Sequence, residues 1–139
     1  MNDLAEEIEM TLDSTGRPWT RREDSWAVPA DGVARELRVS RAGDGLRVDA
    51  VLIEWDEAAP ESLQALTRFL ETARTVRFEV EATKATVLAE VSAERVESEL
   101  PAALAAVSSG CRFLAREAKA LLTPDLARKY LSFVGERGQ

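Results

Sequence analysis

The feature that most constrains the fold is a pair of alternating hydrophobic runs on either side of Ala42-Gly43-Asp44-Gly45. Before this tetrapeptide, Leu37 and Val39 alternate with charged or small polar residues, and after it apolar residues recur at every second position from Leu46 to Leu52. Alternation with a period of two is typical of a β-strand with one buried face. An Asp-Gly pair between two such runs predicts a tight hairpin, so we expect an antiparallel sheet built around it.

The remaining elements are predicted from the same kinds of spacing. Further strands are expected at Trp26-Ala27-Val28, over 76–81 and over 87–91. Helical spacing and proline placement predict four helices: over 3–13, from Pro60, from Ser98 (as the cap, with Pro101 in the first turn) to Leu122, and from Thr123-Pro124 to Gly135. The predicted order is α-β-β-β-α-β-β-α with one added helix, in a single α+β domain over residues 1–139 with an antiparallel sheet.

The strand from Leu46 to Trp55 carries more apolar residues than one buried face needs. Leu52 lies on one face of an ideal strand, and Val51, Ile53 and Trp55 lie on the other. A single layer of helices covers only one face, so the second face needs another cover. Two alternatives remain for this cover: the final helix or a partner protein. Trp55 is consistent with a partner, because tryptophan is favoured at protein contact surfaces.

Composition removes several kinds of chemistry. The 139 residues include no histidine and one cysteine, so the commonest general base is missing, and a thiolate zinc site and an intramolecular disulfide are excluded. Cys111 falls in the apolar row of the long helix and is expected in the core. The carboxylates Glu54, Asp56, Glu79 and Glu81 are expected on solvated surfaces. No catalytic residue, metal site or cofactor is predicted.

Charge and targeting signals narrow the partners and the compartment. The net charge of −7 disfavours a nucleic-acid or anionic-membrane surface and favours a client with basic segments. Asp31-Gly32 and Asp44-Gly45 lack the acidic spacing of calcium loops and are interpreted as turns. The N-terminus is acidic where a signal peptide would be basic and then apolar, and the longest apolar run, 102–107, is too short to span a bilayer. The predicted location is the cytoplasm.

One helix face consists of small residues, namely Ala102, Ala106, Ser109 and Gly110. A glycine inside a helix usually has a packing reason, because it destabilises the helix by about 1 kcal/mol relative to alanine. Close packing on the sheet and contact with another subunit are both consistent with this face.

Three segments carry a family resemblance: Val76-Arg-Phe-Glu-Val-Glu, then Val87-Leu-Ala-Glu-Val, then Glu97-Ser-Glu-Leu-Pro and the helix to Leu122. Together with the order of elements, they make the whole chain resemble the type III secretion chaperone-like superfamily, which includes the YbjN-like proteins. The resemblance implies a homodimer without enzymatic activity. Such a dimer would hold an extended segment of a protein or peptide client on hydrophobic patches of the first helix and the sheet.

The resemblance also implies positions. The residues that match the partner-binding region are Leu4, Ile8, Leu12, Trp26, Val28, Leu37, Val39, Ile53 and Trp55. The candidate dimer contacts are Leu63, Leu66, Phe69 and Leu70. The alternative is a YbjN-like regulatory or stress-response module that binds a specific folded partner and has no role in secretion. A neighbouring gene for a secreted effector would favour the first interpretation, and its absence the second.

Overall fold

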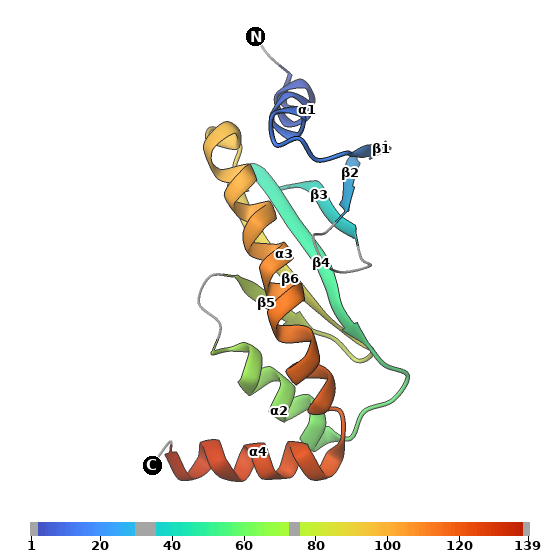
Figure 1. The fold of residues 1–139 in the computed structure, drawn as a ribbon, viewed down its shortest axis with the longest axis vertical. Coiled ribbons are helices and arrows are strands. Elements are labelled where there is room, and N and C mark those ends of the chain that lie inside the picture. The colour runs from blue at the N-terminus through green and yellow to red at the C-terminus, as the bar shows by residue number, and fades with distance from the viewer. Residues whose placement is uncertain (1–2, 30–35, 73–75, 138–139) are drawn as a thin grey trace.

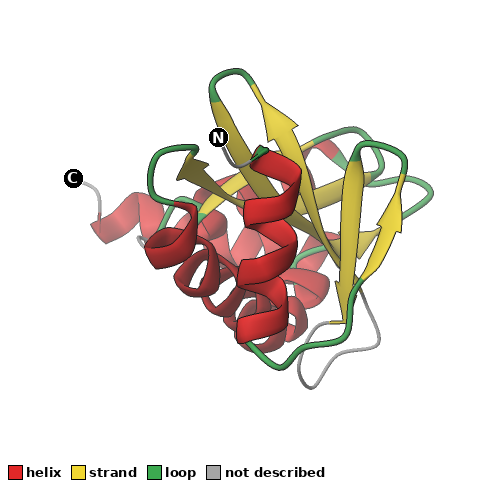
Figure 2. Ribbon diagram, turned by 90° about the horizontal axis from the view of Figure 1, so that it is seen from above, coloured by secondary structure: helices red, strands yellow, loops and turns green. Residues whose placement is uncertain are grey.

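The computed structural model describes residues 3–29, 36–72 and 76–137. These residues form an antiparallel sheet with helices packed against one of its faces (Figures 1 and 2). The helices are α1 (Leu4–Ser14), α2 (Pro60–Leu70), α3 (Val96–Ala120) and α4 (Pro124–Arg137). The strands are β1 (Thr20–Arg22), β2 (Ser25–Pro29), β3 (Glu36–Ala42), β4 (Gly45–Glu54), β5 (Arg77–Val80) and β6 (Lys84–Ser92). The predicted α+β class with an antiparallel sheet is confirmed.

The sheet has six strands in the order β1-β2-β3-β4-β6-β5, and every neighbouring pair is antiparallel. The prediction of three strands before α2 is wrong, because β1 adds a fourth. All three residues of β1 are exposed, so the strand has no buried face that could produce hydrophobic alternation. The turn after β1 contains Glu23, whose φ of 50° is left-handed.

The hairpin between β3 and β4 forms one residue earlier than the Asp-Gly pattern predicts. Ala42 pairs with Gly45, so the two turn residues are Gly43, with a φ of 58°, and Asp44. Gly45 is instead the first residue of β4, where a Cβ would lie 2.4 Å from the carbonyl oxygen of Val91. Gly43 therefore supplies the turn conformation, and Gly45 allows β4 to approach the end of β6.

A bulge in β4 explains its apparent second apolar face. Val51 pairs with Thr86 and Ile53 pairs with Ala85, which leaves Leu52 as an extra residue. The bulge turns Ile53 to the same face as Ala85, and both are buried in the core. The prediction that Ile53 lies on a second face needing its own cover is wrong, although Val51 does lie opposite and is half-buried.

The last helix packs against α2 and does not cover the sheet. Figure 1 shows α4 beside α2 at one end of the molecule. Ser62 donates its hydroxyl to the carbonyl of Leu122 at 3.2 Å, and the Phe69 and Tyr130 rings meet edge to face at 6.2 Å. The predicted end at Gly135 is wrong, because α4 continues to Arg137. No helix in the described part of the chain is long and apolar enough to cross a bilayer.

Helix α3 begins before its predicted cap. Its first residue is Val96, its N-cap is Arg95, and the Glu99 amide donates to the Arg95 carbonyl at 2.8 Å. Val96 is completely buried, and its packing favours the earlier start. Pro101 therefore lies inside the helix, beyond the first turn, where it cannot donate to the carbonyl of Glu97.

Substituting Pro101→Ala is expected to raise the free energy of unfolding by about 2 kcal/mol. Alanine restores the missing amide donor and relieves the clash of the ring with the preceding turn. The greater freedom of the unfolded alanine chain offsets part of this gain. Urea denaturation followed by circular dichroism measures the change, and a variant less stable than the original chain would contradict it.

Candidate functional site

The residues predicted to bind a partner lie mainly in the core. Seven of them are buried: Ile8, Leu12, Trp26, Val28, Leu37, Val39 and Ile53. Leu4 and Trp55 are half-buried and pack against the same core. These side chains hold α1 and the sheet together, so they offer little surface to a client.

Trp26 shows how α1 and the sheet are joined. Its side chain is 1% exposed, and its Nε1 donates to Glu9 on α1 at 3.0 Å. Arg21 on β1 lies over the Trp26 ring, 5.4 Å from its centroid, and its Nη1 donates to the same Glu9 carboxylate at 3.3 Å. The apolar surplus around Trp26 is thus covered by the first helix of the chain itself.

The four residues predicted as dimer contacts lie in the core, against α4 or beside the edge of the sheet. Leu66 and Leu70 are buried in the core, and Phe69 packs against Tyr130 of α4. Leu63 is half-buried and lines a cavity of about 650 Å³ between α2 and the end of β5. Leu70 also borders an adjoining cavity of about 310 Å³ that follows β5. The structure therefore brings Leu63 and Leu70 to one groove beside the sheet edge.

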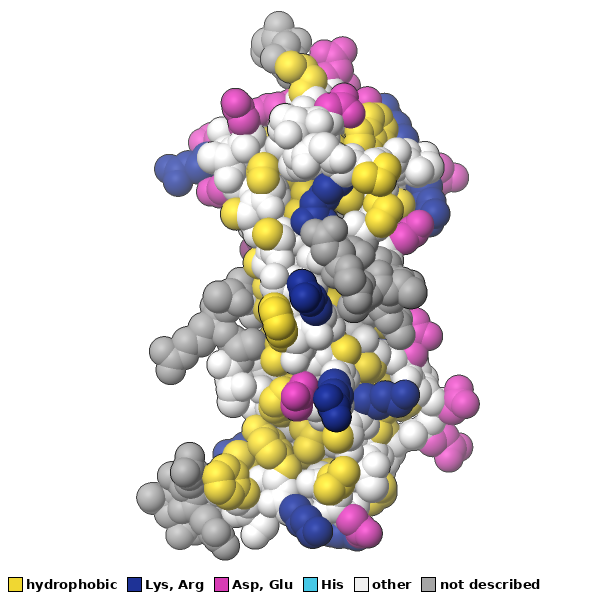
Figure 3. All heavy atoms as spheres, viewed as in Figure 1, with side chains coloured by type: hydrophobic (Ala, Val, Ile, Leu, Met, Phe, Trp, Pro, Cys, Tyr) yellow, Lys and Arg dark blue, Asp and Glu magenta, His cyan; other side chains and the backbone are white. Residues whose placement is uncertain are grey.

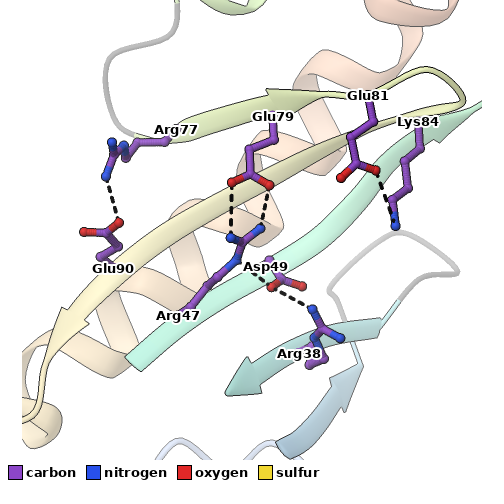
Figure 4. Close-up of polar contacts among 8 residues, drawn as sticks. All are labelled: Arg38, Arg47, Asp49, Arg77, Glu79, Glu81, Lys84 and Glu90. Atoms are coloured by element: carbon purple, nitrogen blue, oxygen red, sulfur yellow. Dashed lines mark hydrogen bonds and ion pairs between the residues drawn. The ribbon is translucent and has the colours of Figure 1, made fainter. Parts of the chain in front are cut away.

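The face of the sheet opposite α3 carries a network of ion pairs (Figure 4). Arg47 on β4 donates to Glu79 on β5 at 3.2 and 2.9 Å and to Asp49 at 2.9 Å. Arg38 on β3 donates to the same oxygen of Asp49 at 3.3 Å. Asp49 is only 6% exposed, so the two guanidinium groups compensate a nearly buried carboxylate.

The electrostatics of this face differ from those of an acid–base site. The hydrogen bond from Arg47 holds the pKa of Glu79 below its ordinary value, and the same bond raises the pKa of Arg47. A carboxylic acid that donates a proton near neutral pH needs a raised pKa instead. Glu54, Asp56 and Glu81 are exposed, as Glu79 is. The Oε2 atom of Glu81 lies 3.8 Å from the Nζ atom of Lys84.

The remaining residues considered for catalysis or metal binding have structural roles wherever the structure describes them. Cys111 is 2% exposed in the core, and Asp44-Gly45 belongs to the β3–β4 hairpin. Asp31-Gly32 lies outside the described residues. Within the described ranges, no three His, Cys, Asp or Glu side chains gather as they would around a metal ion.

The small-residue face of α3 divides between two environments. A Cβ on Gly110 would lie 3.1 Å from a Val87 methyl group, so this glycine packs closely on β6. Ala102 and Ser109 are exposed, and Ala106 is half-buried. Packing on the sheet therefore accounts for Gly110, whereas the neighbouring small residues border a surface.

That surface contains a cavity of about 450 Å³, called here the α3 cavity. Its lining is apolar apart from one serine: Val76, Ala105, Ala106, Ser109, Gly110, Phe113 and Leu114. Phe113 is 67% exposed, which is unusual for so large a hydrophobic side chain. Arg112 lies over its ring at 5.4 Å from the centroid. Phe113 is not among the residues predicted from the sequence, because it lies beside the apolar row of α3 and not within it.

A second apolar area lies at the α4 end of the molecule. Figure 3 shows hydrophobic side chains gathered there, over the region of α2 and α4 in Figure 1. Leu126 and Phe133 on α4 are 44% and 52% exposed. Exposed apolar areas are typical of protein contact surfaces.

Comparisons of the chain with protein-family models, with curated proteins and with solved structures find no match. The resemblance to the type III secretion chaperone-like superfamily therefore stays a prediction. What the chain does has to follow from its own surfaces.

Proposed function

We propose that the chain is a non-catalytic protein-binding module that holds a polypeptide client in the α3 cavity. The observation that carries the proposal is this apolar cavity of about 450 Å³ with Phe113 exposed at its side. Exposed aromatic side chains beside an apolar hollow are typical anchors of protein contacts. The client contributes an apolar side chain that fills the cavity and covers the Phe113 ring.

The charges beside the cavity favour a client with acidic flanks. Arg112 contacts the Phe113 ring, and Arg116 follows one helical turn later on the same side of α3. Both arginines are exposed, and they outnumber Glu117, the exposed acid one helical turn after Phe113. The net charge of the whole chain favours a basic client, but charges close to the contact dominate because screening weakens distant ones. An apolar side chain flanked by Asp or Glu is therefore the proposed recognition element.

The α3 cavity is a different surface from the patches of the first helix and the sheet where the resemblance implies that a client binds. Most side chains of the first helix and sheet named there are core residues, whereas the α3 cavity is open. A role like that of secretion chaperones and a YbjN-like regulatory role both need such a contact surface. The α3 cavity does not favour one of them over the other.

The test is selection from a displayed peptide library on the full chain, followed by binding measurements with the selected peptides. Phe113→Asp is expected to weaken binding at least about tenfold, because it places a charge in the apolar contact. Met10→Asp is the matched control, since Met10 is 65% exposed on α1, and it is expected to leave binding unchanged. Equal binding by the Phe113 variant, or no peptide enriched above background, would refute the proposal.

A further inference from the structure

Strand β5 is the last strand of the sheet, and its edge differs from the opposite one. β1 is three residues long and fully exposed, and its two charged residues, Arg21 and Arg22, have the same sign, so they would repel each other in a symmetric pair of β1 strands. β5 alternates two exposed charged residues with two half-buried apolar ones, Arg77-Phe78-Glu79-Val80. It contains no proline and no register shift. This edge is able to accept another strand.

The hydrogen-bond pattern shows which backbone groups of β5 point outward. The Glu81 amide donates to the Lys84 carbonyl at 2.8 Å, so Glu81 and Lys84 form a hydrogen-bonded pair of the β5–β6 hairpin. Bonded and non-bonded pairs alternate along an antiparallel ladder, and the register here is regular. The backbones of Arg77 and Glu79 thus bond to β6, and those of Phe78 and Val80 point away from the sheet.

We propose that a second copy of the chain pairs with this edge, β5 against β5 in antiparallel orientation, about a twofold axis at Phe78. Phe78 then exchanges backbone hydrogen bonds with Phe78 of the second copy. The outward direction of its amide and carbonyl is the one that this pairing requires. The product is one continuous sheet through both copies, joined by a self-complementary contact.

Charge selects this register from its neighbours. With Phe78 opposite Phe78 of the second copy, Arg77 lies opposite Glu79 of the second copy, and the symmetry repeats this attractive pair. A shift by one bonded pair in one direction places Glu79 opposite Glu79, although it also places Arg77 opposite Glu81. A shift in the other direction places Arg77 opposite Arg77. Both shifts bring like charges together, which is destabilising for directly opposed residues.

The proposed pair also extends the ion pairs already present. Glu79 bonds to Arg47 on its own sheet, and Arg77 bonds to Glu90 at 2.8 Å (Figure 4). Pairing of the two edges links these into a row across both copies. On the helix side, the two Phe78 rings meet beside the groove that α2 and β5 form, which Leu63 and Leu70 border. Aromatic pairs across strands add to the stability of such a contact.

The experiment is sedimentation equilibrium of the full chain from micromolar to millimolar concentration. The original chain is expected to form a dimer. Arg77→Glu and Glu79→Arg, each alone, are expected to weaken the dimer at least about tenfold, because each variant opposes like charges twice. An equimolar mixture of the two variants is expected to restore dimers, as is the chain that carries both substitutions, because both arrangements oppose unlike charges again.

A matched control and an independent readout separate this contact from other effects. Glu117→Arg makes the same charge change on an exposed site of α3 and is expected to leave the dimer intact. A chain that stays monomeric, a dimer that tolerates both single variants, or a mixture that stays monomeric would overturn the proposal. Phe113→Asp tests the client site and is expected to leave the dimer unchanged, so either proposal can fail without the other.

Discussion

The Gly45→Ala variant is expected to lose about 3 kcal/mol of its free energy of unfolding, the strain expected when a group is forced into filled space. A Cβ at this position would lie 2.4 Å from the Val91 carbonyl oxygen, a separation that side-chain rotation cannot relieve because the obstacle is backbone. β4 and β6 would have to separate at this end. Urea denaturation measures the loss, and the fluorescence of Trp26 and the other tryptophans follows unfolding.

Gly135→Ala is the control for that experiment. Gly135 lies in α4, and no atom beyond its own helical turns and chain neighbours lies within 4 Å of the Cβ that alanine would add. Alanine is also the better helix former. This variant is expected to be equally stable or up to about 1 kcal/mol more stable. A Gly45→Ala chain that matched it would show that the end of β4 is free to move away from β6.

The Gly45 position shows what a local pattern predicts and what it misses. The alternation before and after 42–45 correctly predicts a hairpin, because period and turn residues are local properties. The reason for Gly45 is a contact with Val91, 46 positions later, which no local pattern contains. The same holds for the bulge at Leu52, because a run of four apolar residues looks alike with and without an extra residue.

The candidate site was harder to predict than the fold for the same reason. Arg47 and Glu79 are 32 residues apart, so their bond depends on β4 and β5 lying on either side of β6. The spacing of Trp26 and Val28 correctly predicts a strand but does not show which element covers it. Burial by α1 was therefore indistinguishable from burial by a partner. Phe113 interrupts no pattern, and only the structure shows that it is exposed.

The Trp26→Ala variant is expected to lose about 3–5 kcal/mol of its free energy of unfolding, as large-to-small substitutions of buried aromatic residues do. Its side chain is 1% exposed, it donates a hydrogen bond to Glu9, and Arg21 stacks on its ring. Removing the indole leaves a cavity between α1 and β2 and removes the group that both charged residues contact. Because a small domain has a total stability of about 5–15 kcal/mol, part of the population is expected to unfold.

Phe113→Ala gives the matched comparison, since it removes an aromatic ring of which two thirds is exposed. This variant is expected to differ from the original chain by less than about 0.5 kcal/mol, as most surface substitutions do. If Trp26 were a client contact and Phe113 a structural residue, the two results would be reversed. Chemical denaturation of both variants under the same conditions therefore decides which of the two aromatic side chains stabilises the fold and which one is free to contact a client.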